Sequence, residues 1–291
     1  MIPLSVLDLS VVTTGTKPAA ALRNSIDLAR HVDRLGYVRY WLAEHHNLAS
    51  VASPAPDLMI GQIAAVTKNI RVGSGGVMLP NHAPLVVAER FKMLEALFPG
   101  RIDLGLGRAP GTDGATAHAL RSRLDRRDGD DFLERLHELM LWETRDFPAG
   151  HPYNNVVAMP DDSPLPPIWL LGSSDYSSEL SAQVGMGFAF AHHFSTYDAV
   201  EAMTHYRARF KSRVGAPSRT AFWRLPRSPP KLTPKPRSWR RRRTSIACAA
   251  TAASFCHCLM SRRRWPIITP MPSAPRSRAT AHACSSAAPP P

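Results

Sequence analysis

The chain has 291 residues and a formal charge of +13, but the charge is unevenly distributed. Residues 1–215 hold 21 Lys plus Arg against 23 Asp plus Glu, whereas residues 216–291 hold 15 Lys plus Arg and no acidic residue. The first part has no Cys, which excludes a disulfide scaffold or a Cys-based zinc site there, and no apolar run approaches the roughly 20 residues that span a bilayer. We therefore expect one cytoplasmic, membrane-free domain over 1–215 and a different kind of chain after it.

Six runs of apolar, mostly β-favouring residues predict strands at residues 4–12, 37–42, 70–78, 101–107, 168–172 and 186–192. Apolar residues at helical spacing predict a helix after each of the first three strands. The first of these helices ends at Gly36, and the second begins at Ser53-Pro54 as N-cap and first helical residue. The third runs from about Pro84 to Pro99-Gly100.

The chain becomes less regular after residue 107. We expect a polar loop to about residue 130, a helix from Phe132, and a Pro-rich connection over 147–167. A helix is expected after each of the last two strands, and the first of these begins near Ser177.

Strands that alternate with helices require a parallel sheet covered by helices, either doubly wound or closed into a barrel. Polar residues directly follow several strands, at Glu44-His45-His46, Asn81-His82, Arg108, Ser173-Ser174 and His192-His193. Loops gathered at one face of a barrel explain this recurrence better than one crevice does. We therefore predict a TIM-type (β/α)8 barrel, which lacks strands seven and eight because only six strands precede residue 216.

Residues 216–291 are rich in Pro, Arg, Ala and Ser and contain no Gly, Asp, Glu, Asn or Gln. A disordered basic tail is one account, and a shifted reading frame, which we favour, is the other. The basic runs leave nucleic-acid binding as an outside alternative. Cys256 and Cys258 stand too close for a usual zinc knuckle, so we expect no zinc there or at Cys248 and Cys284.

The Glu44-His45-His46 motif lies just past the second strand, where a barrel places its reactive groups. Neighbouring side chains on a strand point to opposite faces, so His45 and His46 are not expected to serve one site together. A hydrogen-bonded pair of loop histidines is the alternative. We expect no metal, because barrel hydrolases usually place a His-x-His pair on the first strand, where this chain has only Asp8.

Glycines interrupt the third and fourth predicted strands, at Gly73, Gly75, Gly76, Gly105 and Gly107. Strands without side chains make a flat floor suited to a planar ring, and tight packing of the barrel is the alternative. Two such strands side by side favour the ring.

Arg108 follows the fourth strand, and its guanidinium can bind a phosphate through two hydrogen bonds; an ordinary surface arginine is the alternative. Ser173, Ser174 and Ser177 lie at the start of the helix after the fifth strand. Hydroxyls and free amides at a helix N-terminus bind anions, although a plain serine N-cap is more common. Together with the glycine floor, these residues predict a phosphate and a flat ring, as in flavin mononucleotide (FMN).

Four motifs resemble the bacterial luciferase-like, flavin-dependent oxidoreductases, in family order: YWLAEHH at 40–46, VGSGGVMLPNHAP at 72–84, GRIDLGLGRAPG at 100–111 and LLGSS at 170–174. The resemblance covers residues 1 to about 213. It implies a barrel that binds reduced FMN and uses oxygen as co-substrate to oxidise a small organic molecule. An enzyme that uses a reduced deazaflavin is the nearest alternative, and a non-catalytic remnant is another.

The resemblance also implies roles for single residues. His45 matches the family's catalytic histidine, and Gly75-Gly76 matches a pair joined by a cis peptide under the flavin ring. Arg108 matches the arginine that contacts the phosphate. The remaining phosphate positions fall on Ser173, Ser174 and Ser177. A flavin reductase is a possible partner, and a complete barrel would be expected to form a homodimer.

Overall fold

The computed structural model describes residues 3–121, 131–193 and 195–211, which all belong to one compact unit. Expectations for residues 216–291, including those on zinc, nucleic acid and the reading frame, lie outside the described residues. Among the described residues, no helix combines the length and the apolarity that crossing a bilayer requires.

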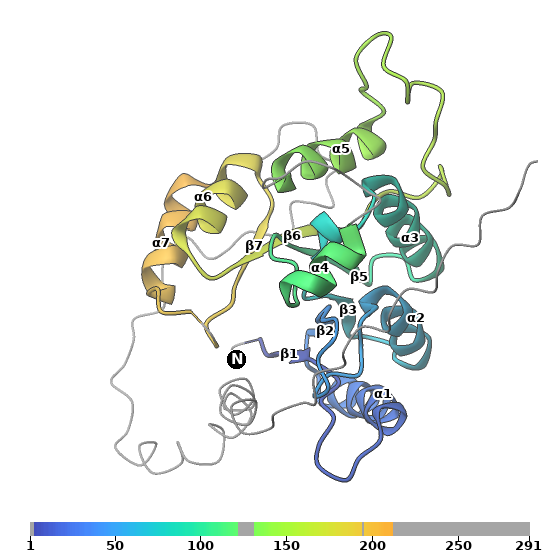
Figure 1. Cartoon of the computed structure of the whole chain (residues 1–291), viewed down its shortest axis with the longest axis vertical. Helices are drawn as coiled ribbons and strands as arrows, with labels where there is room; N and C mark the ends of the chain where they lie inside the picture. Colours follow the sequence, from blue (N-terminus) through green and yellow to red (C-terminus); the bar gives the residue numbers. More distant parts are fainter. Residues whose placement is uncertain (1–2, 122–130, 194, 212–291) are drawn as a thin grey trace, which may run out of the picture. The chain divides into compact units, whose positions relative to one another are not determined.

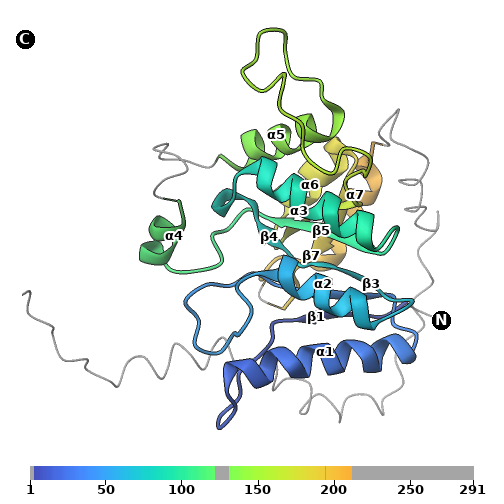
Figure 2. The ribbon, with the colours of Figure 1, turned by 90° about the vertical axis from the view of Figure 1, so that its right-hand side faces the viewer.

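Parallel strands form the centre of the fold, and helices lie outside them (Figures 1 and 2). The strands are β1 (Ser5–Asp8), β2 (Arg39–Leu42), β3 (Arg71–Ser74), β4 (Val77–Met78), β5 (Ile102–Gly107), β6 (Ile168–Gly172) and β7 (Gly187–Phe190). The helices are α1 (Pro18–Arg34), α2 (Pro56–Val66), the short 3-10 helix η1 (Leu79–Asn81), α3 (Pro84–Leu97), α4 (Gly114–Arg121), α5 (Phe132–Thr144), α6 (Asp175–Val184) and α7 (Ala199–Arg209).

The strand order is β1-β2-β3-β5-β6-β7, with β4 beside β5, and every pairing between named strands is parallel. The third predicted strand is split, because β3 ends at Ser74 and β4 resumes at Val77 on the other side of the Gly75–Gly76 peptide. That peptide is cis, as the resemblance implied. The described strands thus occupy six consecutive positions in the wall of a TIM-type barrel, which confirms the expected fold class.

Two helix starts lie two residues from the predicted positions. The second helix begins at Pro56 instead of Pro54, because the residue before a proline is held in an extended conformation, and Ala55 has φ −132° and ψ 85°. The helix after β6 begins at Asp175, two residues before Ser177, because Ser174 is the extended N-cap and an acidic residue suits the first turn.

The structure also adds the helix α4 within the expected polar loop. Asp113 precedes this helix, and its carboxylate accepts hydrogen bonds from the amide and the hydroxyl of Thr116, at 3.0 and 2.8 Å. This is the bonding of an N-cap aspartate, and the Asp-Gly start at 113–114 was the signal in the sequence.

The two faces of the strands differ in chemistry. Outward residues such as Leu42, Val72 and Leu104 are fully buried against helical residues such as Ile63 and Phe91, and they form the main apolar core. The register places the inward residues Trp41, Gly73 and Asp103 on the opposite face. The strands are therefore apolar toward the helices and more polar toward the interior of the barrel.

Asp103 closes the interior at the amino-terminal ends of the strands. Its side chain has no solvent exposure and accepts hydrogen bonds from Arg39 Nε at 3.0 Å, Trp41 Nε1 at 3.1 Å and Arg71 Nη2 at 2.6 Å. Arg39 also lies over the Trp169 ring, with 5.0 Å between the guanidinium carbon and the ring centre. One buried carboxylate thus joins β2, β3 and β5, and the arginine over Trp169 links them to β6.

Replacing Asp103 with Asn should lower the free energy of unfolding by about 3 kcal/mol, because two arginines lose the charge that balances them inside the protein. Urea unfolding of the full chain at pH 7 measures this change. Asp27→Asn is the control, since Asp27 pairs with Arg30 on the surface, at 72% and 46% side-chain exposure, and its loss should cost less than about 1 kcal/mol. Equal costs for the two variants would contradict the structural role of Asp103.

Candidate active site

The sequence-predicted site residues follow four different strands at their carboxyl ends. His45 comes after β2, Gly75 after β3, Arg108 after β5 and Ser173 after β6. Because all these strands are parallel, the four segments lie at the same end of the barrel wall. This confirms that the polar residues converge at one end, whereas their roles in binding or catalysis stay predictions.

The His45 ring is held by the loop that follows β5. Its Nδ1 atom lies 3.2 Å from the carbonyl oxygen of Gly111. Because a carbonyl only accepts hydrogen bonds, Nδ1 carries a proton, and the neutral ring keeps its lone pair at Nε2. The atom of His45 that can accept a proton is therefore Nε2. His46 turns to a different partner, Glu44.

A second histidine at this end comes from the segment after β7. Burial lowers the pKa of His193 below its ordinary value, and electrostatic coupling to the rings of His45 and His192 lowers it further. His193 is therefore close enough to His45 for the two rings to influence each other electrostatically. The sequence marked His192-His193 as polar residues after a strand, but nothing in it paired them with His45.

Packing between strands accounts for the glycines of β3, β5 and the link to β4. A Cβ atom at Gly73 would lie 2.5 Å from the Asp103 carbonyl oxygen, and one at Gly105 would lie 2.1 Å from the Ser74 carbonyl oxygen. A Cβ atom at Gly75 or Gly76 would also lie 2.8 Å from its nearest neighbour. The tight-packing interpretation thus explains both interrupted strands, and the glycines by themselves do not require a ligand.

Arg108 lies beside the first turn of α6. Its guanidinium carbon is 4.7 Å from the centre of the ring of Tyr176, the second residue of that helix. Ser174 is the N-cap but makes no side-chain capping bond, and Ser177 packs against Gly172, where a Cβ would lie 2.0 Å from its hydroxyl oxygen. The structure therefore brings Arg108 to the helix start that carries the predicted serines.

The groups around this helix start suit a phosphate in part. A guanidinium, serine hydroxyls and the amides of a first helical turn are all donors that bind anions. The carbonyl of Ser173 accepts a hydrogen bond from the Ser195 hydroxyl at 2.6 Å, which ties the start of this turn to the segment after β7. Asp175 is the one acidic residue of the first turn, and its carboxylate accepts the Tyr176 amide at 2.8 Å. An anion would therefore rely on Arg108 and on donors of Ser173, Ser174 and Ser177, and it would lie near the Asp175 carboxylate.

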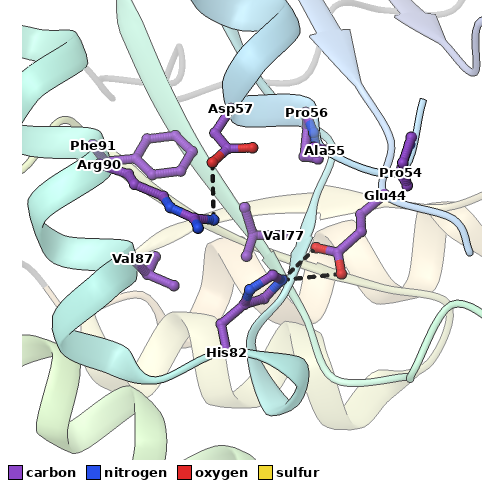
Figure 3. Close-up of a pocket in the computed structure, with 10 residues that line it drawn as sticks. All are labelled: Glu44, Pro54, Ala55, Pro56, Asp57, Val77, His82, Val87, Arg90 and Phe91. Atoms are coloured by element: carbon purple, nitrogen blue, oxygen red, sulfur yellow. Dashed lines mark hydrogen bonds and ion pairs between the residues drawn. The ribbon is translucent and has the colours of Figure 1, made fainter. Parts of the chain in front are cut away.

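Glu44 belongs to the predicted motif at this end, but sequence reasoning gave it no role of its own. Its carboxylate is buried and accepts hydrogen bonds from His46 Nε2 at 2.8 Å, the Met78 amide at 2.8 Å, Asn81 Nδ2 at 3.1 Å and His82 Nε2 at 3.0 Å. Figure 3 shows Glu44 and His82 facing each other. Among the residues that the structure describes, no group of three or more His, Cys, Asp or Glu is arranged to hold a metal ion. The four donors around its carboxylate show that Glu44 joins its own loop to β4, η1 and the residue after η1.

A small cavity of about 40 Å³ lies beside the Glu44–His82 pair, between this pair and the Asp57–Arg90 ion pair (Figure 3). Its volume is sufficient for a water molecule and its lining carries several polar groups. The predicted site residues do not line it. The flavin site expected from the sequence would thus lie elsewhere at this end of the barrel.

Two effects oppose each other in the titration of Glu44. Burial alone would raise its pKa, but the hydrogen bonds and charge of His82, the hydrogen bond of His46 and the Met78 amide outweigh burial and hold the pKa below 4.5. A carboxyl with a lowered pKa stabilises the fold above its unfolded pKa, and this stabilisation is lost as the pH falls through the folded value.

Glu44→Gln should therefore lower the free energy of unfolding by about 2 kcal/mol at neutral pH, because the amide presents an NH2 group to donors that need an acceptor. The difference in free energy of unfolding between the wild-type chain and Glu44→Gln should have its full size above about pH 4.5 and become smaller at lower pH. Urea unfolding at a series of pH values measures it. A difference that grows as the pH falls would contradict the assigned charge state.

The chain matches known proteins over most of its length. A family model for luciferase-like monooxygenases matches residues 2–225. Protein YvbT of Bacillus subtilis (strain 168) is 55% identical over 207 residues, which cover 71% of this chain and 60% of that protein. A luciferase-like monooxygenase of Escherichia coli (strain K12) is 49% identical over 210 residues, or 72% of this chain and 61% of that protein. The chain thus spans about 60% of the length of these relatives.

Solved structures with the same fold include apo-MsnO8, which has 43% identity and a TM-score of 0.66 and matches 73% of this chain and 61% of its own. The oxygenating constituent of 3,6-diketocamphane monooxygenase from Pseudomonas putida, solved in complex with FMN, has 18% identity and a TM-score of 0.57 over 72% of this chain and 61% of its own. The second likeness concerns the fold alone.

Proposed function

The chain belongs to the luciferase-like monooxygenase family, and from this premise we propose that it binds reduced FMN at the carboxyl ends of its strands. With oxygen as co-substrate, it would oxidise a small organic molecule. The observation that carries the proposal is the meeting of Arg108 with the first turn of α6, at the end of the barrel wall that also holds His45. A monooxygenase of this kind needs a phosphate anchor and a proton-transfer group at one mouth.

Different residues of this chain would bind the phosphate and transfer the proton. Arg108 and the donors of Ser173, Ser174 and Ser177 would hold the phosphate. Gly75 and Gly76 would present backbone without side chains to the ring. Reduced FMN would supply the electrons that activate oxygen. His45 would accept or return a proton at Nε2, because its Nδ1 donates to Gly111.

Enzymes of this class depend on the exclusion of water from the reacting centre. In the described part of the chain, β1 and β7 are the two ends of the strand order, and each pairs with one neighbour. Leu7 in β1, which faces the interior, is 41% exposed. We therefore expect this barrel wall to bind FMN but to couple oxygen poorly to product, with hydrogen peroxide released instead.

A reduced deazaflavin is the second candidate cofactor, and a remnant that binds no flavin is the third possibility. For the living cell we propose a cytoplasmic location, because residues 1–215 contain no Cys and no apolar run of spanning length. A separate reductase would deliver the reduced flavin.

The test of FMN binding is a comparison of FMN with riboflavin, which lacks the phosphate, by quenching of flavin fluorescence on the full chain. Arg108→Gln should weaken FMN binding about 10- to 100-fold and leave riboflavin unchanged, because a hydrogen bond to a charged group contributes about 1.5 to 3 kcal/mol. Arg30→Gln, on the exposed face of α1, is the control and should change neither.

Riboflavin binding as tight as FMN binding in the wild-type chain would refute the phosphate site. Absence of any flavin binding would favour the remnant, and preferential binding of a deazaflavin would favour the second candidate.

A homodimer is the assembly we propose. Exposed apolar side chains share one face of the paired helices α2 and α3, at Leu58, Val86, Met93 and Leu97, with exposures of 72%, 38%, 54% and 63%. Leu58 and Met93 also line a groove between these helices. A second copy that presents the same face would cover both strips by two-fold symmetry.

Met93→Glu should convert the dimer to a monomer, because it places two carboxylates in an apolar contact. Sedimentation velocity on the full chain measures the change. Val200→Glu is the matched control, since Val200 is an apolar residue on α7 that is at least as exposed as Met93, at 71% against 54%. A monomeric wild-type chain, or loss of the dimer in the control alone, would contradict the α2–α3 interface.

A further inference from the structure

The buried carboxylate of Glu44 has no part in the flavin chemistry proposed above, yet it collects donors from segments far apart in the sequence. The Met78 amide and Asn81 Nδ2 reach it from β4 and η1, at 2.8 and 3.1 Å. An ionised carboxylate only accepts hydrogen bonds, so all of its partners, including His46 and His82, donate to it. This is an arrangement that glutamine could not satisfy.

Asn81 extends the network from Glu44 to the loop after β5. The same Nδ2 that donates to Glu44 also lies 3.1 Å from the carbonyl oxygen of Pro110. The other side-chain atom of Asn81, Oδ1, accepts from Arg121 Nε of α4 at 3.0 Å. One buried amide therefore links the Glu44 carboxylate to both the 110–111 backbone and the helix that follows it.

Gly111, the next residue, holds the His45 ring. Its carbonyl oxygen accepts from His45 Nδ1 at 3.2 Å and from the His46 amide at 3.4 Å. Gly111 has φ +66°, and a Cβ atom there would lie 2.9 Å from the Glu44 carbonyl oxygen, so the loop backbone packs directly on Glu44. The position of the Gly111 carbonyl therefore depends on the contacts that hold the loop after β5.

We propose that Glu44 is a positioning residue for His45: through Asn81 and the 110–111 backbone, it keeps the Gly111 carbonyl where it selects the Nδ1–H tautomer of the His45 ring. This selection leaves Nε2 as the atom that accepts a proton. The proposal rests on the proposed role of His45 in the reaction, but the tautomer itself is a property of the protein without any cofactor.

The test is the tautomer of His45 in the full chain, labelled with 15N-histidine and measured by long-range 1H–15N correlation at about pH 8, where an ordinary imidazole is neutral. His45→Gln identifies the signals by their loss. The wild-type ring should be predominantly Nδ1–H. In Glu44→Gln, the ratio of Nδ1–H to Nε2–H should fall about tenfold, which corresponds to the loss of one net hydrogen bond.

Two further variants make the result specific. Glu95→Gln is the matched control: Glu95 is also a buried carboxylate, but it accepts the Gly100 amide at the opposite end of β5, so the His45 tautomer should not change. Asn81→Ala removes the link and leaves the carboxylate in place, and it should shift the His45 tautomer as Glu44→Gln does.

Asn81→Ala also tests whether this network sets the His45 tautomer if Glu44→Gln fails to fold. A wild-type His45 tautomer in Asn81→Ala would overturn the proposal, and so would a wild-type tautomer in folded Glu44→Gln. An equal shift in Glu95→Gln would overturn it as well, since the effect would then come from general destabilisation. Failure of the wild-type chain to bind FMN would refute the proposed function but leave this result unchanged.

Discussion

A carboxylate that is buried in its ionised form must be surrounded by donors, and Asp103 and Glu44 meet that requirement at opposite ends of the strands. Asp103 draws Arg39, Trp41 and Arg71 together at the amino-terminal ends. Glu44 draws its donors from β4, η1 and its own loop at the carboxyl-terminal ends. Because the partners come from segments distant in sequence, these two side chains hold the strands in register. Asp103 does so at the amino-terminal ends, and Glu44 does so at the carboxyl-terminal ends, where we propose the reaction takes place.

The direction of the strands determines where the proposed site residues gather. Parallel strands place their carboxyl ends on one side, so His45, Arg108 and Ser174 meet there although they lie on three different segments. The loop from β5 contributes twice, since Arg108 reaches α6 while Gly111 holds the ring of His45. One short loop thus connects the proposed phosphate anchor with the proposed proton-transfer group, and Glu44 fixes that loop.

The alternation of strands and helices could be predicted from the sequence because buried parallel strands are continuous apolar runs and Gly36, Pro84 and Gly100 mark helix ends. The role of Glu44 could not be predicted, because three of its four partners stand 34 to 38 residues further along the chain and no spacing rule links them. The glycines of β3 and β5 carried an ambiguous signal. A missing side chain is compatible with a ligand and with a neighbouring strand. The close contacts of Gly73 with the Asp103 carbonyl and of Gly105 with the Ser74 carbonyl distinguish the two.

Hydrogen exchange of the full chain, measured with and without FMN, tests whether FMN binds at the carboxyl ends of the strands. Bound FMN should slow exchange in peptides from the His45 loop, the loop 107–113 and the first turn of α6. It should leave the segment before β5, around Gly100, unchanged, because that segment lies at the other end of the strands. Protection confined to the Gly100 end, or to the helices α2 and α3, would contradict the account.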